Sequence, residues 1–122
     1  MNALLIVAHG SRRSQSNDEV AALADTIREK CSEEYPIVQA GFLELAEPSI
    51  PDGITNCIND GASHVTVLPY FLNSGRHVVE DVPEMLEQAR SQHPDAEITL
   101  AQHLGASSMM IDLVISLAKS AS

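Results

Sequence analysis

Imidazole and carboxylate side chains follow three of the apolar runs in this sequence of 122 residues. His9 comes directly after the run at residues 3–8, Glu44 lies near the end of the run at 37–45, and His77 follows the run at 64–68. Two imidazoles and one carboxylate suit divalent first-row ions such as Co²⁺, Ni²⁺, Fe²⁺ and Zn²⁺. An incomplete set of protein ligands leaves positions open for exchange, which metal transfer requires. The pattern therefore predicts a metal-transfer site, provided that the fold brings these three side chains together.

Short apolar runs alternate with amphipathic segments along the chain, which predicts strands that alternate with helices. A capping box of Ser16 and Glu19 predicts one helix start, and Ser49 before a proline predicts another. Asp81 is the expected N-cap of the third helix, because Pro83 must fall in its first turn. The expected strands are residues 3–8, 37–45, 64–68 and 96–101, and apolar spacing over 109–117 predicts the last helix.

Four strand–helix units in a row predict a single α/β domain over residues 1–122, with a parallel sheet and helices on both faces. Right-handed crossovers favour a doubly wound, flavodoxin-like strand order of 2-1-3-4. In such sheets ligands bind beyond the carboxyl ends of the strands, at the switch point between the first and third strands. His9, Glu44, His77 and His103 all follow strands, so we expect them to converge at that edge.

Each of these residues also has a structural alternative. In the alternative interpretation, His9 is a loop residue bonded to a carbonyl, Glu44 is a solvated carboxylate, and His77 is a surface residue at a helix start. His103 is equally open to lining the pocket or lying on the surface. The two other histidines, at positions 64 and 93, are expected to be structural or exposed.

Composition excludes several classes of protein. The hydrophobic share of 44% and charged share of 20% are ordinary for a globular protein. No apolar run approaches the ~20 residues that span a bilayer, and no signal peptide is evident, so the cytoplasm is the expected location. The net charge of −10 argues against nucleic-acid and anionic-membrane partners. Cys31 and Cys57 lack metal-site spacing and are expected to be reduced thiols in the core.

Known catalytic and nucleotide motifs add little. The sequence contains no P-loop and no G-x-G-x-x-G, so no nucleotide cofactor is expected. His9-Gly10 invites comparison with the phosphate-accepting histidine of phosphatases. Those enzymes place an arginine just before their His-Gly, whereas Ala8 stands there in this chain.

Three segments together resemble a known family. They are residues 5–12 (LIVAHGSR), 42–50 (FLELAEPSI) and 69–83 (PYFLNSGRHVVEDVP), and Leu104-Gly105 also fits. In these segments the sequence resembles the short, single-domain form of the CbiX-type sirohydrochlorin chelatases. The second and third segments are specific in combination, whereas His-Gly-Ser-Arg alone is not.

The resemblance implies an ATP-independent class II chelatase that inserts a divalent metal ion into sirohydrochlorin or a related tetrapyrrole. It implies that His9 and His77 bind the metal and that Glu44 is a further ligand. Co²⁺ is the expected substrate ion, with Ni²⁺ or Fe²⁺ as alternatives, in cobalamin or sirohaem biosynthesis. Because the long members contain two such domains, it also implies a homodimer.

The remaining candidates would contact the substrate. Arginines beside the two histidines form a basic mouth that suits substrate carboxylates, and two aromatic residues offer a flat wall to a macrocycle. In the alternative interpretation, the aromatic residues pack in the core, the glycine belongs to a turn, and the arginines are solvated on the surface. The substrate-binding candidates are Ser11, Arg12, Arg13, Tyr70, Phe71, Gly75, Arg76 and His103. A non-catalytic metal or tetrapyrrole carrier and a degenerate regulatory domain are the alternative functions.

Overall fold

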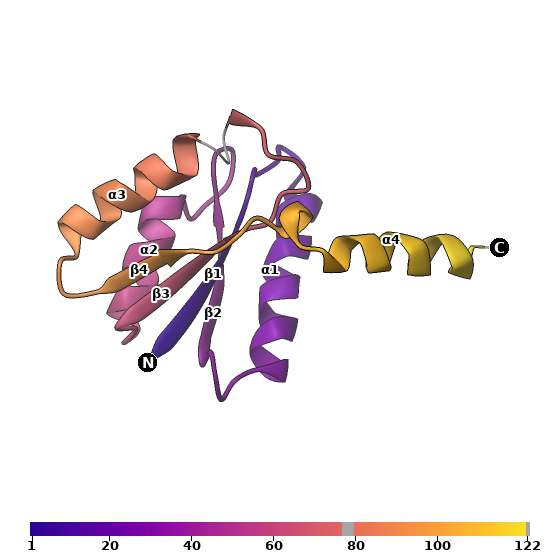
Figure 1. The fold of residues 1–122 in the computed structure, drawn as a ribbon. Helices are drawn as coiled ribbons and strands as arrows, with labels where there is room; N and C mark the ends of the chain where they lie inside the picture. Colours follow the sequence, from indigo (N-terminus) through magenta and orange to yellow (C-terminus); the bar gives the residue numbers. More distant parts are fainter. Residues whose placement is uncertain (77–79, 122) are drawn as a thin grey trace.

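A four-stranded parallel sheet forms the centre of the protein in a computed structural model that describes residues 1–76 and 80–121 (Figure 1). The strand order is β2-β1-β3-β4, and every neighbouring pair is parallel, which confirms the predicted topology. The elements are β1 (Asn2–Ala8), α1 (Ser14–Lys30), β2 (Ile37–Phe42), α2 (Ile50–Asn59), β3 (His64–Pro69), α3 (Val82–Gln92), β4 (Glu97–Leu100), the 3₁₀ turn η2 (Leu104–Ala106) and α4 (Met109–Ser120).

Side chains alternate between the two faces of the sheet and build two apolar clusters. On one face, Ile6 and Val38 pack against Ala24 of α1. On the other, Leu5 belongs to a larger cluster that includes Leu86 and is covered by α2 and α3. Helices therefore lie on both faces, as predicted (Figure 1).

Two helix starts follow the local signals in the sequence. The Ser49 hydroxyl accepts a hydrogen bond from the Asp52 backbone N–H at 3.2 Å, and Pro51 lies in the first turn of α2. In α3, Asp81 occupies the N-cap position and Pro83 lies in the first turn. Both starts match the prediction. Proline is favoured in the first turn of a helix because the backbone N–H groups there have no partner within the helix.

The start of α1 differs from the prediction. The helix begins at Ser14, with Arg13 at the N-cap, so the capping box expected at Ser16 and Glu19 is wrong. The competing interaction comes from Asn17, whose side chain accepts from the Ser11 N–H at 2.9 Å and donates to the Ser11 carbonyl at 2.8 Å. A side-chain amide that closes the preceding loop in this way lets the helix begin earlier.

Both cysteines are free thiols, as expected. Cys31 lies at the end of α1 and is partly buried, whereas Cys57 in α2 is fully buried. Burial, with the nearby Asp60 carboxylate as the second cause, raises the pKa of the Cys57 thiol from 9.0 to about 11. The folded protein therefore holds this thiol in its neutral form.

We expect the Cys57 thiol to make stability fall in alkaline solution. Its folded pKa is raised, so its contribution is intact below pH 9 and is lost as pH rises through about 11. The full loss is on the order of 2 kcal/mol. Urea unfolding of the wild type and Cys57→Ala between pH 8 and 11 measures it, with Cys31→Ala as control. An equal loss in the wild type and Cys57→Ala would contradict the assignment.

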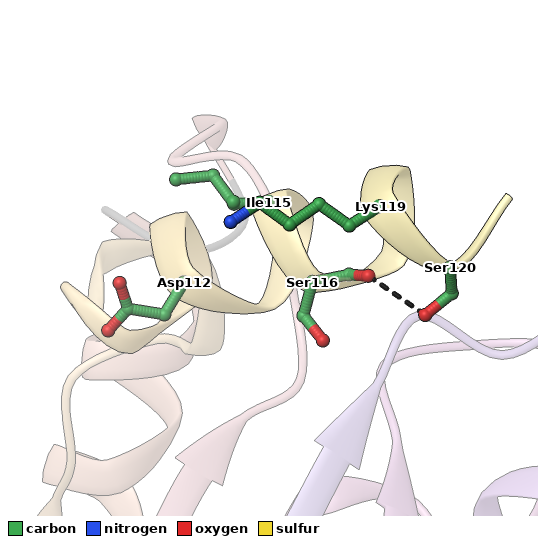
Figure 2. A pocket seen from close by; sticks show the side chains of 5 residues that line it. All are labelled: Asp112, Ile115, Ser116, Lys119 and Ser120. Atoms are coloured by element: carbon green, nitrogen blue, oxygen red, sulfur yellow. Dashed lines mark hydrogen bonds between the residues drawn. The ribbon is translucent and has the colours of Figure 1, made fainter. Parts of the chain in front are cut away.

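The last helix lies apart from the rest of the fold. α4 extends away from the sheet (Figure 1), and the turn η2 is the element that it mainly contacts. None of its 12 residues, all of which the structure describes, is buried. Figure 2 shows Asp112, Ser116, Lys119 and Ser120 along this helix. No helix within residues 1–76 and 80–121 is long and apolar enough to cross a bilayer.

Candidate functional site

Two of the three predicted metal ligands lie side by side at the carboxyl edge of the sheet. The pairing of β1 with β2 continues past both strands, because the Leu43 N–H donates to the Ala8 carbonyl at 2.9 Å and the Glu44 N–H donates to the His9 carbonyl at 3.0 Å. This extension of the ladder places Glu44 directly beside His9, and both side chains are exposed. An imidazole and a carboxylate thus face solvent from adjacent positions.

Gly10 makes this juxtaposition possible. Its φ of 89° lies in the left-handed region, and a Cβ at this position would stand 1.7 Å from the Glu44 carbonyl oxygen. Only glycine lets the two loops approach so closely. At Gly75 an added Cβ would meet none of the described residues within 4 Å, so no contact with that part of the chain requires glycine there.

The His9 ring rests on an aromatic residue of the core. Its centroid is 4.4 Å from that of Phe71, with 39° between the ring planes. Phe71 is only 4% exposed and belongs to the larger apolar cluster, whereas the neighbouring Tyr70 is 39% exposed. Phe71 therefore packs against the imidazole from the side of the core, whereas the Tyr70 ring is accessible to solvent.

The loop between β1 and α1 carries two of the predicted arginines. Arg12 and Arg13 are exposed, and the Arg13 N–H donates to the Ser11 hydroxyl at 3.0 Å. The Asn17 side chain holds both backbone polar groups of Ser11, so the loop beside His9 is fixed at its centre. This role of Asn17 was not predicted, because its side chain bonds to a loop six residues earlier in the chain.

The segment after β4 joins the same edge. The Gly105 N–H donates to the Phe71 carbonyl at 2.9 Å, and a Cβ on Gly105 would stand 1.8 Å from the Leu72 carbonyl oxygen. His103, two residues earlier, is half-buried next to η2. The structural need for Gly105 was also missed, because nothing in the local sequence shows which backbone will approach it.

The third predicted ligand, His77, lies outside the described residues. Arg76 precedes it and forms an exposed ion pair with Glu80 at 3.2 Å. Within residues 1–76 and 80–121, no three His, Cys, Asp or Glu side chains are grouped closely enough to hold a metal ion. Of the three predicted ligands, the structure therefore describes His9 and Glu44, and a metal-binding role for all three stays a prediction.

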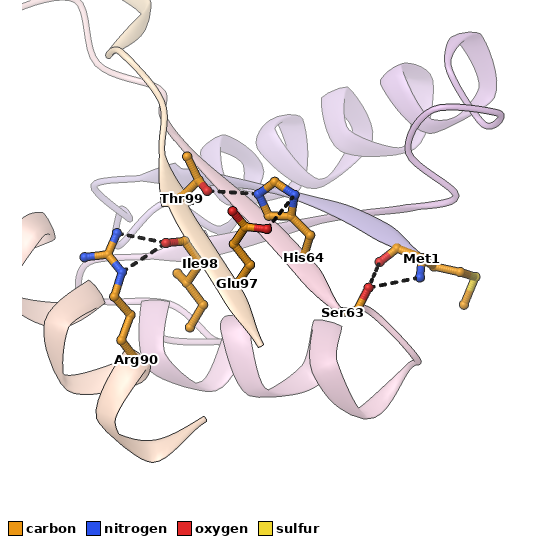
Figure 3. Close-up of polar contacts among 7 residues, drawn as sticks. All are labelled: Met1, Ser63, His64, Arg90, Glu97, Ile98 and Thr99. Atoms are coloured by element: carbon orange, nitrogen blue, oxygen red, sulfur yellow. Dashed lines mark hydrogen bonds and ion pairs between the residues drawn. The ribbon is translucent and has the colours of Figure 1, made fainter. Parts of the chain in front are cut away.

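The two histidines expected to be structural do bond to other side chains. His64, at the amino end of β3, lies 2.9 Å from the Thr99 hydroxyl and 4.0 Å from a Glu97 carboxylate oxygen (Figure 3). His93, at the end of α3, lies 3.0 Å from the Thr55 hydroxyl. Both are remote from the carboxyl edge, as predicted.

The strand order and the helices on both faces define a flavodoxin-like α/β domain. The CbiX family model matches residues 3–121, and the chain belongs to this family. It is 36% identical over 113 residues to the chloroplastic sirohydrochlorin ferrochelatase of Arabidopsis thaliana, covering 93% of this chain and 49% of that protein. It is 30% identical over 139 residues to the sirohydrochlorin cobaltochelatase of Methanocaldococcus jannaschii, covering 94% and 96%.

A solved structure shows the same fold. The sirohydrochlorin chelatase SirB of Bacillus subtilis subspecies spizizenii, crystallised with cobalt, superposes with a TM-score of 0.84 at 31% identity. The match covers 98% of this chain and 50% of SirB. The chain thus spans about half the length of SirB and of the Arabidopsis relative, and nearly the whole length of the archaeal one.

Proposed function

We propose that this chain is a metal chelatase that inserts a divalent ion into sirohydrochlorin without ATP, with Co²⁺ as the preferred ion. The observation that carries the proposal is that His9 lies beside Glu44, because Gly10 lets the two loops that carry them approach closely. Relatives from the same family carry the names cobaltochelatase and ferrochelatase, which supports this reaction and leaves Fe²⁺ as the alternative ion.

In the proposed mechanism the protein holds the ion and removes protons. Imidazole and carboxylate groups bind first-row ions and release them by ligand exchange, and His77 would complete the set. When the ion enters the macrocycle, two pyrrole N–H protons must leave. Once the ion has left them, the Glu44 carboxylate and the His9 imidazole would each accept one of these protons, because both residues are exposed at the edge where the macrocycle would lie.

We further propose that two copies act together. The chain matches about half the length of two longer chelatases, and the resemblance implies that such long members contain two domains of this kind. A second copy would supply the missing half by two-fold symmetry. The substrate would then lie between two carboxyl edges, each with its own His9 and Glu44.

The test is metal insertion into sirohydrochlorin by the purified protein, followed by absorbance under anaerobic conditions. Co²⁺, Ni²⁺ and Fe²⁺ are supplied in turn, and the rate without protein is subtracted. The proposal expects many turnovers per chain, fastest with Co²⁺. Stoichiometric retention of metal or pigment without turnover would identify a carrier instead, and binding of neither would identify a regulatory domain.

The arginines beside His9 should set the affinity for the carboxylate-rich substrate. We expect Arg12→Gln together with Arg13→Gln to raise KM for sirohydrochlorin roughly threefold to tenfold, because both guanidinium groups are exposed and screened by solvent. The effect should shrink as salt is added. Steady-state kinetics at two ionic strengths measure it. Arg28→Gln, which removes an arginine paired with Asp25 elsewhere on α1, should leave KM unchanged.

A further inference from the structure

The backbone of Leu45 adopts a conformation that leucine rarely takes. Its φ is 65°, and among residues 1–76 and 80–121 it is the one non-glycine residue with a positive φ. In this left-handed region the Cβ of most residues lies too close to a backbone carbonyl oxygen, whereas glycine has no Cβ and asparagine is tolerated. Leucine at this position therefore costs stability that glycine or asparagine would not.

The loop that carries Leu45 is closed at its base and held beside His9. The Phe42 N–H donates to the Pro48 carbonyl at 2.9 Å, and Leu45 is the middle residue of the segment between them. The Glu44 N–H donates to the His9 carbonyl on the neighbouring loop. Tight reversals of this kind commonly include a left-handed residue, which is usually glycine. The loop therefore accounts for the left-handed backbone but not for the leucine side chain.

The Leu45 side chain does not pack in the core. It is 55% exposed, and neither apolar cluster of the described residues includes it. Leu43, two residues earlier, is by contrast partly buried against the larger cluster. A single exposed leucine is ordinary on a protein surface, but here the exposure coincides with an unfavourable backbone conformation. Strained residues of this kind cluster at functional sites, so a ligand is the expected partner of the side chain.

The position of Leu45 indicates which ligand that is. Leu45 directly follows Glu44 at the carboxyl end of β2, and Tyr70, also exposed, follows β3. The strand order β2-β1-β3 places His9, which follows β1, between them. Exposed apolar side chains therefore lie at the strand ends on both sides of His9. A tetrapyrrole combines a flat apolar ring with carboxylates at its rim, so its binding requires apolar surface in addition to arginines.

We propose that Leu45 is a substrate-binding residue whose side chain packs against the flat face of the tetrapyrrole ring beside Glu44. The inference rests on the proposed function and deepens it by separating two tasks at this edge. Leu45 has no metal-binding or proton-accepting atom in its side chain, so it contributes to ring binding and not to metal capture or proton removal. Burial of its exposed surface against the ring should account for roughly threefold to tenfold in affinity.

The test compares Leu45→Asn with Leu45→Met in the full chain. Asparagine tolerates the left-handed backbone but lacks apolar surface, whereas methionine keeps an apolar surface of similar size. Absorbance titration with metal-free sirohydrochlorin measures the dissociation constant, and urea unfolding measures stability. We expect Leu45→Asn to bind the pigment roughly threefold to tenfold more weakly and to unfold at a higher urea concentration than the wild type. Leu45→Met should bind within about twofold of the wild type.

Several results would overturn the inference. Unchanged pigment binding by Leu45→Asn, or an equal loss in Leu45→Met, would show that the apolar side chain does not contact the ring. A lower urea midpoint for Leu45→Asn would show that the leucine is retained for stability. Light scattering should give Leu45→Asn the same mass as the wild type, and a different mass would place Leu45 in a contact between copies instead.

Metal insertion separates this inference from the proposed reaction. Leu45→Asn should raise KM for sirohydrochlorin while kcat with saturating pigment stays within about twofold of the wild type, as expected when a binding contact alone is lost. Pigment binding that depends on Leu45 without turnover would refute the proposed reaction and leave the inference standing. Turnover by the wild type with an unchanged KM in Leu45→Asn would refute the inference and leave the proposed reaction standing.

Discussion

Replacement of His9 by alanine should lower the rate of metal insertion by on the order of 100-fold or more while leaving the fold intact. The imidazole is exposed, so its loss opens no internal cavity, but it removes a proposed metal ligand and proton acceptor beside Glu44. Glu44→Gln should act in the same direction, since the amide neither carries charge nor accepts a proton. Insertion rates with saturating Co²⁺ and sirohydrochlorin measure both effects.

The matched control is His64→Ala. This histidine is also partly exposed and bonded to other side chains, but it lies at the amino end of β3, away from the site. Its replacement should leave the insertion rate near that of the wild type. If His9→Ala retains the wild-type rate while remaining folded, the assignment of the site to this edge is wrong.

The second large effect should come from Gly10→Ala. The added Cβ would lie 1.7 Å from the Glu44 carbonyl oxygen on a backbone with φ of 89°, so the loops at the ends of β1 and β2 must separate. We expect a loss of about 2–4 kcal/mol in the free energy of unfolding, and a fall in insertion rate because Glu44 moves away from His9. Urea unfolding and the insertion assay measure the two effects.

Gly75→Ala provides the comparison for stability. An added Cβ there meets nothing within 4 Å in the part of the chain that the structure describes, so the free energy of unfolding should change by less than about 1 kcal/mol. Equal stability of Gly10→Ala and Gly75→Ala would show that the loops at the ends of β1 and β2 separate without a cost in the free energy of unfolding.

The sheet was predictable because its determinants are local. Apolar runs mark each strand, Ser49 with Pro51 marks a helix start, and right-handed crossovers leave few strand orders. The start of α1 was not predictable in the same way. The Asn17 side chain bonds to a loop six residues away, whereas the capping-box pattern considers only the helix itself.

The site was predictable as a set of strand ends but not as a geometry. The sequence places His9 and Glu44 after neighbouring strands, yet their contact depends on two backbone hydrogen bonds that continue the β1–β2 ladder past Ala8. The support of His9 by Phe71 depends on side-chain packing between strands 62 residues apart in the chain. For α4, periodicity showed where the apolar residues lie but not that its own sheet leaves them uncovered.

If His9 binds the ion as proposed, its contact with Phe71 has a consequence for the speed of ion capture. Phe71 is a core residue, so it restricts the positions open to the imidazole that packs on it before any ion arrives. Little conformational freedom then remains to be lost on capture, and the slow step becomes the departure of water from the hydrated ion. Ions that shed water at different speeds should therefore load at correspondingly different rates, even where their final affinities are alike.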